Sequence, residues 1–233
     1  MKAKRRFNIG LWVLLCVPCL LASCDHDVHD GEEEGGLSVS LTWADEADEG
    51  TEVEDVKLWI FDADKGSLIE EKHYGSTEEV ASQRFQLPEG TYCIQTFSNL
   101  TEPFFISEQT RALTNWNNIL IGLTNPKDVR NNAYFGVTDV KIDNKEGNYV
   151  VQTQKKKVLA ELTIIIENIP KGTEMSGKAL DCAMCLFPTQ KNSDGDYGLP
   201  SIEPTEVELP TLLATESTLK SEVIRLMPTI RGS

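Results

Sequence analysis

The stretch that decides the fold is VKLWIFDADKGSLIEEKHY, residues 56–74. Its first part, residues 56–61, is rich in β-branched and aromatic side chains, which is typical of a strand. The polar residues 62–66 supply turn chemistry, because Gly66 can adopt the positive φ that tight turns require. Residues 67–74 then provide a plausible return strand. The stretch therefore predicts a β-hairpin.

Alternating patterns continue on both sides of this hairpin. Residues 37–43 alternate apolar side chains with serine and threonine, and residues 134–142 alternate more weakly. After a chain reversal at residues 88–90, residues 91–100 form two predicted faces: Tyr92, Ile94 and Thr96 on one, and Cys93, Gln95 and Phe97 on the other. Residues 115–123 fit a short helix or a strand equally well. Short strands separated by turns predict an all-β fold built from sandwiches of two sheets.

The polar stretch at residues 143–148 marks an expected domain boundary. Beyond it, residues 158–167 form the strongest predicted strand, with Val158, Ala160, Leu162, Ile164 and Ile166 on one face. Only about four strands follow the boundary, whereas a sandwich of this type uses about seven. We therefore expect two transthyretin-like or Ig-like β-sandwich domains in tandem, residues 37–148 and 149–233, the second of them incomplete.

Two explanations of the short second domain stay open: truncation, or completion by a strand from a partner. Either way, an incomplete sandwich exposes apolar faces such as that of Ile164 and Ile166, which promotes aggregation unless something covers them.

The first 23 residues are typical of a targeting segment. Positive charges at residues 2–6 precede an apolar run at residues 11–21, which is too short to span a bilayer. The sequence Leu21-Ala22-Ser23-Cys24 then resembles the lipobox of bacterial lipoprotein signals. This resemblance implies cleavage between Ser23 and Cys24 and attachment of lipid to the Cys24 thiol. Two or more acyl chains make a durable anchor. The alternative is an ordinary secretory signal whose cysteine is incidental.

Residues 24–36 are expected to form a flexible acidic tether, because their carboxylates repel one another and their glycines resist ordering. The segment resembles the acidic export signal of surface lipoproteins of the Bacteroides group, which implies the outer surface of the outer membrane. A simple solvated tether is the alternative. In an enteric host, an aspartate after the lipidated cysteine would instead imply retention at the inner membrane.

Charge narrows the possible partners. Removal of residues 1–23 takes away four positive charges and no negative charge, so the formal net charge falls from −15 to −19. Such an acidic chain disfavours nucleic acid or an anionic membrane face as a partner.

Catalytic chemistry is scarce in the sequence. Of three histidines, His26 and His29 lie in the tether, which leaves His73 as the folded candidate for a general base. No nucleophile turn such as G-x-S-x-G accompanies it. We therefore expect no enzymatic activity, no catalytic residue and no cofactor. His26-x-x-His29 could hold a metal, but its composition predicts disorder, so no metal site is expected.

Three cysteines follow the tether: Cys93, Cys182 and Cys185. Their odd number predicts at least one thiol that is free or paired with another molecule. Cys182-x-x-Cys185 has the spacing of a redox motif, but a strand would turn the two thiols to opposite faces. Buried thiols or a disulfide are the favoured interpretation. Residues 62–66 and 194–196 have aspartates as in calcium loops but lack the closing glutamate, which favours simple turns.

Several segments together resemble a known family. They are DVKLWIFDADKGSLIEE (residues 55–71), LPEGTYCIQTFSNL (87–100), NAYFGVTDV (132–140) and KKKVLAELTIIIENIP (155–170). In order and spacing they resemble the FimB-type fimbrial anchor lipoproteins of the Bacteroides group, over the range from Cys24 to about residue 170. The resemblance implies two transthyretin-like sandwiches at the base of a fimbria, where the protein starts assembly and meets a stalk subunit. Subunits of such fimbriae join by β-strand addition.

A second function stays open from the sequence. A surface glycan-binding lipoprotein associated with an outer-membrane nutrient importer would share the anchor, the tether and the sandwiches. It would bind sugar through exposed aromatic side chains. Only Trp116 and a few loop tyrosines are available for such a platform, since Trp43 and Trp59 lie on predicted strands and are expected to pack inside. This scarcity favours the fimbrial interpretation.

Overall fold

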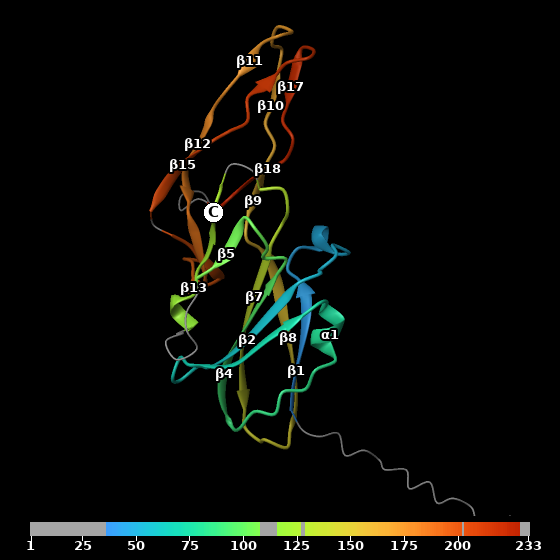
Figure 1. Cartoon of the computed structure of the whole chain (residues 1–233), viewed down its shortest axis with the longest axis vertical. Helices are drawn as coiled ribbons and strands as arrows, with labels where there is room; N and C mark the ends of the chain where they lie inside the picture. Colours follow the sequence, from blue (N-terminus) through green and yellow to red (C-terminus); the bar gives the residue numbers. More distant parts are fainter. Residues whose placement is uncertain (1–35, 108–115, 127–128, 202, 229–233) are drawn as a thin grey trace, which may run out of the picture. The chain divides into compact units, whose positions relative to one another are not determined.

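The computed structural model describes residues 36–107, 116–126, 129–201 and 203–228 (Figure 1). The predicted signal peptide, Cys24 and nearly all of the predicted tether lie outside these residues. Within them the structure is almost entirely β, which confirms the all-β fold class. No helix among the described residues is both long and apolar enough to cross a membrane.

Six strands form the main sheet. In spatial order they are β1 (Gly36–Trp43), β8 (Asn148–Lys157), β7 (Tyr134–Ile142), β4 (Gly90–Ser98), β2 (Val56–Asp62) and β3 (Leu68–Tyr74). β2 and β3 pair antiparallel from Val56 opposite Tyr74 to Phe61 opposite Leu68, which confirms the predicted hairpin. Gly66 in its turn has φ of 70°. β1 and β8 pair in parallel over their shared length.

The two faces of this sheet contact two different cores, as the alternation in residues 91–100 predicts. Tyr92 and Ile94 of β4 join one apolar cluster with residues of β1 and β2, such as Leu37 and Leu58. Cys93 and Phe97 of the same strand point to the other face and join a second cluster. A single strand thus contributes to both cores, because successive side chains of a strand point to opposite faces.

A second sheet packs on the second cluster. Its four strands, in order, are β14 (Tyr197–Pro200), β13 (Cys185–Lys191), β6 (Ile121–Leu123) and β5 (Phe104–Ile106). Among the described residues, helical structure is confined to α1 (Thr77–Ala81) and to the 3-10 turns η3 (Glu46–Asp48) and η4 (Trp116–Asn118). The segment whose sequence fitted a helix or a strand contains both, η4 followed by β6.

The domain boundary expected at residue 148 does not separate the sheets. The polar stretch before it is a hairpin turn, in which the amide of Glu146 donates to Asn144 Oδ1 at 3.0 Å. The strand that begins at Asn148 is β8, which pairs with β1 and, at its end, with β7. In the other direction, β13 pairs with β6. A polar stretch between strands therefore marks a chain reversal here, not a border between sheets.

The long strand expected at residues 158–167 is also broken. β8 ends at Lys157, and the chain continues as β9 (Ala160–Leu162) and β10 (Ile165–Glu167). The physical reason lies in Val158 and Leu159, which are consecutive and yet both buried in the second core. Two neighbouring residues cannot be buried against one core in a regular strand, so the alternation fails at this point.

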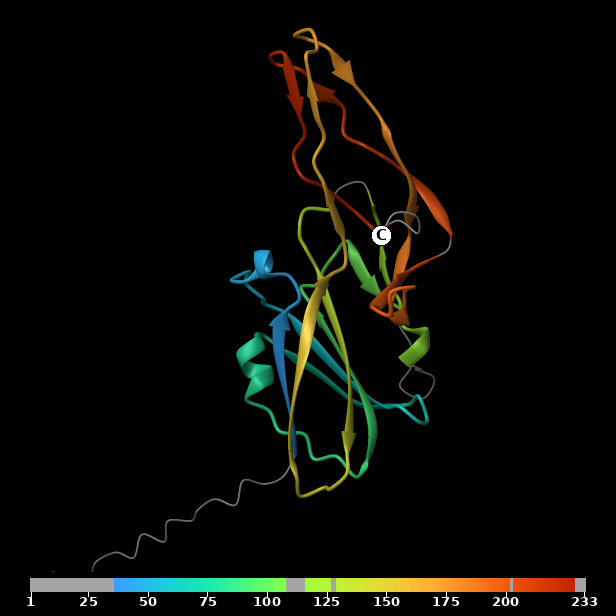
Figure 2. The ribbon, with the colours of Figure 1, turned by 180° about the vertical axis from the view of Figure 1, so that it is seen from behind.

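Residues beyond β8 form more strands than the four expected, but short ones. β9 pairs with β18 (Ile224–Leu226), and β10 pairs with β17 (Thr218–Lys220). The two pairs follow each other along the same two stretches of chain, and we call this two-stranded unit ribbon A. β11 (Glu174–Met175) pairs with β16 (Leu212–Leu213), and β12 (Lys178–Ala183) pairs with β15 (Pro204–Glu208). We call these two pairs together ribbon B. Figure 2 shows both ribbons from behind.

Candidate subunit-binding edge

The two ribbons leave strand edges open. In the part of the chain that the structure describes, each strand of ribbon A and of ribbon B has one strand partner and no second one. A two-stranded unit is only marginally stable by itself, whereas three or more strands with an apolar face are stable. An open edge also carries backbone N–H and C=O groups that can pair with another chain. Both ribbons are therefore suited to accept a further strand.

Exposed apolar side chains concentrate in the same region. The described part of the chain exposes eight large hydrophobic residues, and six of them lie between residues 162 and 223: Leu162, Ile165, Leu180, Met184, Leu213 and Val223. Ile164 and Ile166, which the sequence suggested as the exposed face, are half-buried, while Ile165 between them is 57% exposed. The reason is the pairing of Ile166 with Leu219, which is buried. The expected exposed apolar surface is present, on the opposite face of β10.

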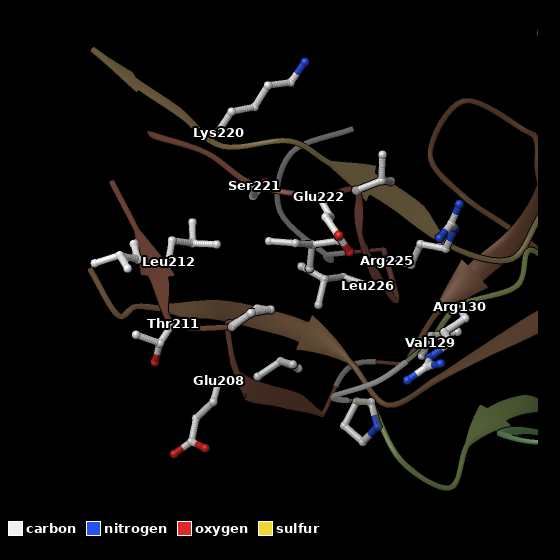
Figure 3. Close-up of a pocket in the computed structure, with 16 residues that line it drawn as sticks. Val129, Arg130, Glu208, Thr211, Leu212, Lys220, Ser221, Glu222, Arg225 and Leu226 are labelled. Carbon is white, nitrogen blue, oxygen red and sulfur yellow. The ribbon is translucent and has the colours of Figure 1, made fainter. Parts of the chain in front are cut away.

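A cavity of about 810 Å³ lies beside ribbon A (Figure 3). One wall consists of seven consecutive residues, 220–226, and the facing wall includes residues 210–213. The face of a strand would present only alternate residues to a cavity. Because consecutive residues line this one, it runs along the backbone edge of the chain. We call residues 220–226 the acceptor edge.

The two walls differ in their ability to pair with another chain. Pro210 interrupts one wall, and proline has no N–H to donate to a strand ladder. The acceptor edge has no proline between Lys220 and Leu226. The Ser221 amide donates to the Ile164 carbonyl at 2.9 Å within ribbon A. In an extended chain the next amide, that of Glu222, points away from this partner. The acceptor edge is therefore the better template for an added strand.

Side chains along the acceptor edge combine apolar and charged groups. Ile224 and Leu226 contact a small core that also contains Cys182 and Val207. Val223 is 46% exposed, and Lys220 and Glu222 are exposed. Such a surface can hold an extended peptide through main-chain hydrogen bonds and select it through alternate side chains. The sequence analysis did not predict this role, although a proline-free run after Pro204 and Pro210 is compatible with an open edge.

The three described cysteines form no disulfide with one another. Cys93 is fully buried, and burial together with the nearby Asp139 carboxylate raises the pKa of its thiol to about 12. Burial also raises the pKa of Cys182. Cys185 is half-buried and lies on the next strand, so the chain breaks between the two cysteines of the C-x-x-C spacing. For the C-x-x-C pair, the expectation of buried thiols is confirmed for Cys182.

The remaining candidates from the sequence do not form a site. His73 lies exposed on β3, where its Nε2 contacts a carboxylate oxygen of Asp55. Asp62 Oδ1 accepts from the amides of Asp64 and Lys65, which confirms a turn at this position. Among the residues with described coordinates, no cluster of three or more His, Cys, Asp or Glu side chains could hold a metal ion.

The three tryptophans among the described residues are all half-buried. Trp43 and Trp59 are half-buried and pack against the two cores, as their position on strands predicts. Trp116 is also half-buried and packs on the second core.

Several solved structures are similar to this chain, and they show its fold. The fimbrial anchor protein Mfa2 from Porphyromonas gingivalis has 14% identity and a TM-score of 0.62, over 84% of this chain and 74% of that chain. A putative adhesin from Bacteroides thetaiotaomicron has 12% identity and a TM-score of 0.58, over 85% and 71%. A putative adhesin from Bacteroides ovatus has 14% identity and a TM-score of 0.57, over 89% and 71%.

No curated protein sequence matches the chain. The family model described as "Fimbrillin-A associated anchor proteins Mfa1 and Mfa2" matches residues 24–209, which is most of the chain. The resemblance inferred from the sequence is thereby confirmed: the chain belongs to the family of fimbrillin-A associated anchor proteins.

Proposed function

We propose that the protein is a lipid-anchored surface protein of the outer membrane that holds a fimbria at its base and initiates its assembly. In this proposal it accepts an extended strand of a fimbrial stalk subunit along the acceptor edge, residues 220–226. The observation that carries the proposal is a proline-free strand edge beside a cavity, which pairs with no second strand among the described residues, in a member of a fimbrial anchor family. The role is structural and involves no enzymatic step.

The membrane end of the proposal rests on Cys24. Its thiol would carry the lipid after cleavage between Ser23 and Cys24, and residues 24–36 would lead from the membrane to β1. The family match begins at residue 24, at the cysteine that the lipobox resemblance singles out. A chain cut there keeps every residue that the family model matches and loses only the predicted targeting segment. This agreement supports the lipid anchor.

Strand addition explains how one edge can provide a firm attachment. Each main-chain hydrogen bond of an added strand contributes roughly 0.5–1.5 kcal/mol net, so a partner that pairs along the acceptor edge gains from several such bonds. An added strand also turns ribbon A into a three-stranded unit, which is the smallest that is stable alone. The same strand covers Val223, whose exposed apolar surface otherwise faces water.

Substitution at Glu222 tests the acceptor edge. Glu222→Pro removes the amide that points away from ribbon A, and its ring blocks the approach of a partner strand. Glu222→Gln is the matched control, because it removes the same charge and keeps the N–H. With about 1.4 kcal/mol for the lost hydrogen bond and the steric clash, we expect Glu222→Pro to lower capture of the partner about tenfold. Glu222→Gln should capture it normally.

Capture is measured by crosslinking in the host outer membrane, followed by mass spectrometry of the products. Stalk subunits crosslinked near residues 220–226 would support the proposal. Equal capture by both Glu222 variants would show that this edge is not the acceptor. If an importer barrel and its glycan-binding companions dominate the products, the glycan-binding alternative replaces the anchor function.

A further inference from the structure

A continuous series of polar contacts joins the acceptor edge to the main sheet. It begins at Arg225, within the acceptor edge, whose Nε donates to Asn132 Oδ1 at 2.7 Å and to Glu161 Oε1 at 3.1 Å. Asn132 Nδ2 also donates to the same oxygen of Glu161 at 3.2 Å. Asn132 lies two residues before the start of β7, and Glu161 lies on β9. The three side chains therefore tie both strands of ribbon A to the start of a main-sheet strand.

The series continues from Glu161 into the sheet. The other carboxylate oxygen, Glu161 Oε2, lies 3.5 Å from Lys157 Nζ at the end of β8. Lys157 Nζ in turn lies 2.9 Å from Asp48 Oδ1 in η3. We call Asp48, Lys157, Glu161 and Arg225, together with Asn132, the ion-pair ladder. It connects four separate regions of the sequence, since only Lys157 and Glu161 are close neighbours along the chain.

The ladder is partly shielded from water, which strengthens it relative to an ordinary surface pair. The side chain of Asp48 is 9% exposed, and that of Arg225 is 21% exposed. The hydrogen bond with Asp48 raises the pKa of Lys157. Partial burial pushes the pKa of Glu161 upward, but the hydrogen bond from Asn132 and the charges of Lys157 and Arg225 outweigh it and lower this pKa. Both ladder groups therefore favour their charged forms.

Apolar contacts hold ribbon A mainly at the residues that flank it. Val158 and Leu159 before β9 and Met227 after β18 are buried in the second core. The small core beside the ribbon has three buried members among the described residues, Cys182, Val207 and Leu226. Ribbon B contains a useful contrast, the ion pair between Lys178 and Glu206 at 2.9 Å. Those two side chains are 53% and 60% exposed, and they join two strands of one ribbon. Of these two sets of ion pairs, only the ladder links ribbon A to the main sheet.

We propose that the ion-pair ladder is a positioning device, which fixes ribbon A on the main sheet so that the acceptor edge is held ready for a partner strand. Glu161 is its central positioning residue, because it contacts Asn132, Lys157 and Arg225. The consequence for the partner rests on the function proposed above, whereas the fixing of ribbon A does not. A preorganised edge loses less conformational freedom on binding, which increases affinity without any new contact with the partner.

Two matched variants of the full mature chain test this inference. Glu161→Gln removes the central charge of the ladder, and Glu206→Gln removes the charge of the exposed pair in ribbon B. Amide hydrogen exchange is measured for the peptides that cover residues 218–226 and 174–183. Loss of the Glu161 charge weakens the contacts between ribbon A and the main sheet, which lowers the free energy required to open ribbon A locally. Glu161→Gln should therefore accelerate exchange in residues 218–226 about tenfold. Glu206→Gln should leave that segment unchanged, and Glu161→Asp should restore much of the protection.

The same variants are then crosslinked in the host outer membrane. Accelerated exchange together with reduced capture of stalk subunits by Glu161→Gln alone would support both the ladder and the acceptor edge. Accelerated exchange with normal capture would keep the ladder as a fastening of ribbon A but overturn its role for the partner. Unchanged exchange at residues 218–226 in Glu161→Gln would overturn the positioning device, whatever happens to capture, and would leave the anchor function to the Glu222 experiment.

Discussion

Lys155 provides a quantitative test of the packing around the first core. It lies on β8, its residue is only 3% exposed, and its Nζ lies 3.5 Å from the centroid of the Trp43 ring. No carboxylate among the described residues lies within ion-pair distance of this ammonium. Burial lowers the pKa of Lys155 from 10.5 to about 8, against a smaller opposing effect of Glu78. We therefore predict that Lys155→Met, which keeps the length of the side chain and removes the charge, stabilises the protein.

The magnitude follows from that pKa. A shift of one pKa unit corresponds to about 1.4 kcal/mol, so lowering the pKa from 10.5 to about 8 costs the charged form roughly 3.5 kcal/mol. The contact of the ammonium with the Trp43 ring returns roughly 0.5–2 kcal/mol, which the variant loses. The expected gain at pH 7 is therefore about 1.5–3 kcal/mol in the free energy of unfolding. For a chain of this length that corresponds to an increase of roughly 3–12 °C in Tm.

The pH dependence gives a second, independent signature. Because the pKa of Lys155 is lower in the folded chain, the unfolded chain binds more protons between pH 8 and 10.5, and stability from this group rises with pH in that window. Lys155→Met lacks this rise. Urea unfolding of both chains, followed by tryptophan fluorescence, should show the advantage of the variant shrinking from pH 7 to pH 10. A variant that is less stable at pH 7, or whose advantage does not change with pH, would refute the reasoning.

Three further outcomes are expected. Cys24→Ala should release the protein from membranes; co-sedimentation of this variant with the outer membrane would exclude the lipid anchor. Gly136→Ala should destabilise the chain by about 1–3 kcal/mol in thermal unfolding, since a Cβ there would lie 2.5 Å from Thr153 Cγ2 and 2.9 Å from the Gln154 carbonyl. Since the pKa of Glu161 is lowered in the folded chain, its stabilising contribution is present above pH 4.5 and is lost as the pH falls further. Pepsin should therefore cut ribbon A faster as the pH drops below 4.5, and Glu161→Gln should not show this change.

Local patterns in the sequence predicted the local structure correctly. The β2–β3 hairpin needed only apolar runs and a glycine turn, and the two faces of β4 needed only alternation. The pairing of β8 with β1 was not predictable in this way. The paired residues of the two strands are about 110 positions apart in the sequence, and the alternation within β8 does not indicate which strand lies beside it. The same applies to the ladder, where Asn132, Glu161 and Arg225 look like ordinary surface residues in the sequence. A pattern reveals which face a residue occupies, but not which distant strand it meets.

The broken strand at residues 158–167 shows a second limit. Its alternation was the clearest in the chain, yet two consecutive buried residues, Val158 and Leu159, end the regular pattern. The chain uses them to close the second core and then leaves the main sheet as ribbon A. Sequence periodicity thus predicted strand structure, while the change of sheet depended on tertiary packing that periodicity does not record.

The division between well-packed sheets and thin ribbons suits an anchor. A protein that waits for a partner needs a stable body and an open edge at the same time, and regions that bind or move come from the least stable parts of a fold. Here the two large cores provide the body, and ribbon A remains open because so little apolar surface is buried in it. An open edge invites pairing between copies of the same chain, but Lys220 and Glu222 on the edge and the strong negative charge of the chain oppose that pairing. Under the function proposed above, a stalk strand with less negative charge than the anchor would meet less repulsion than a second anchor at the same edge.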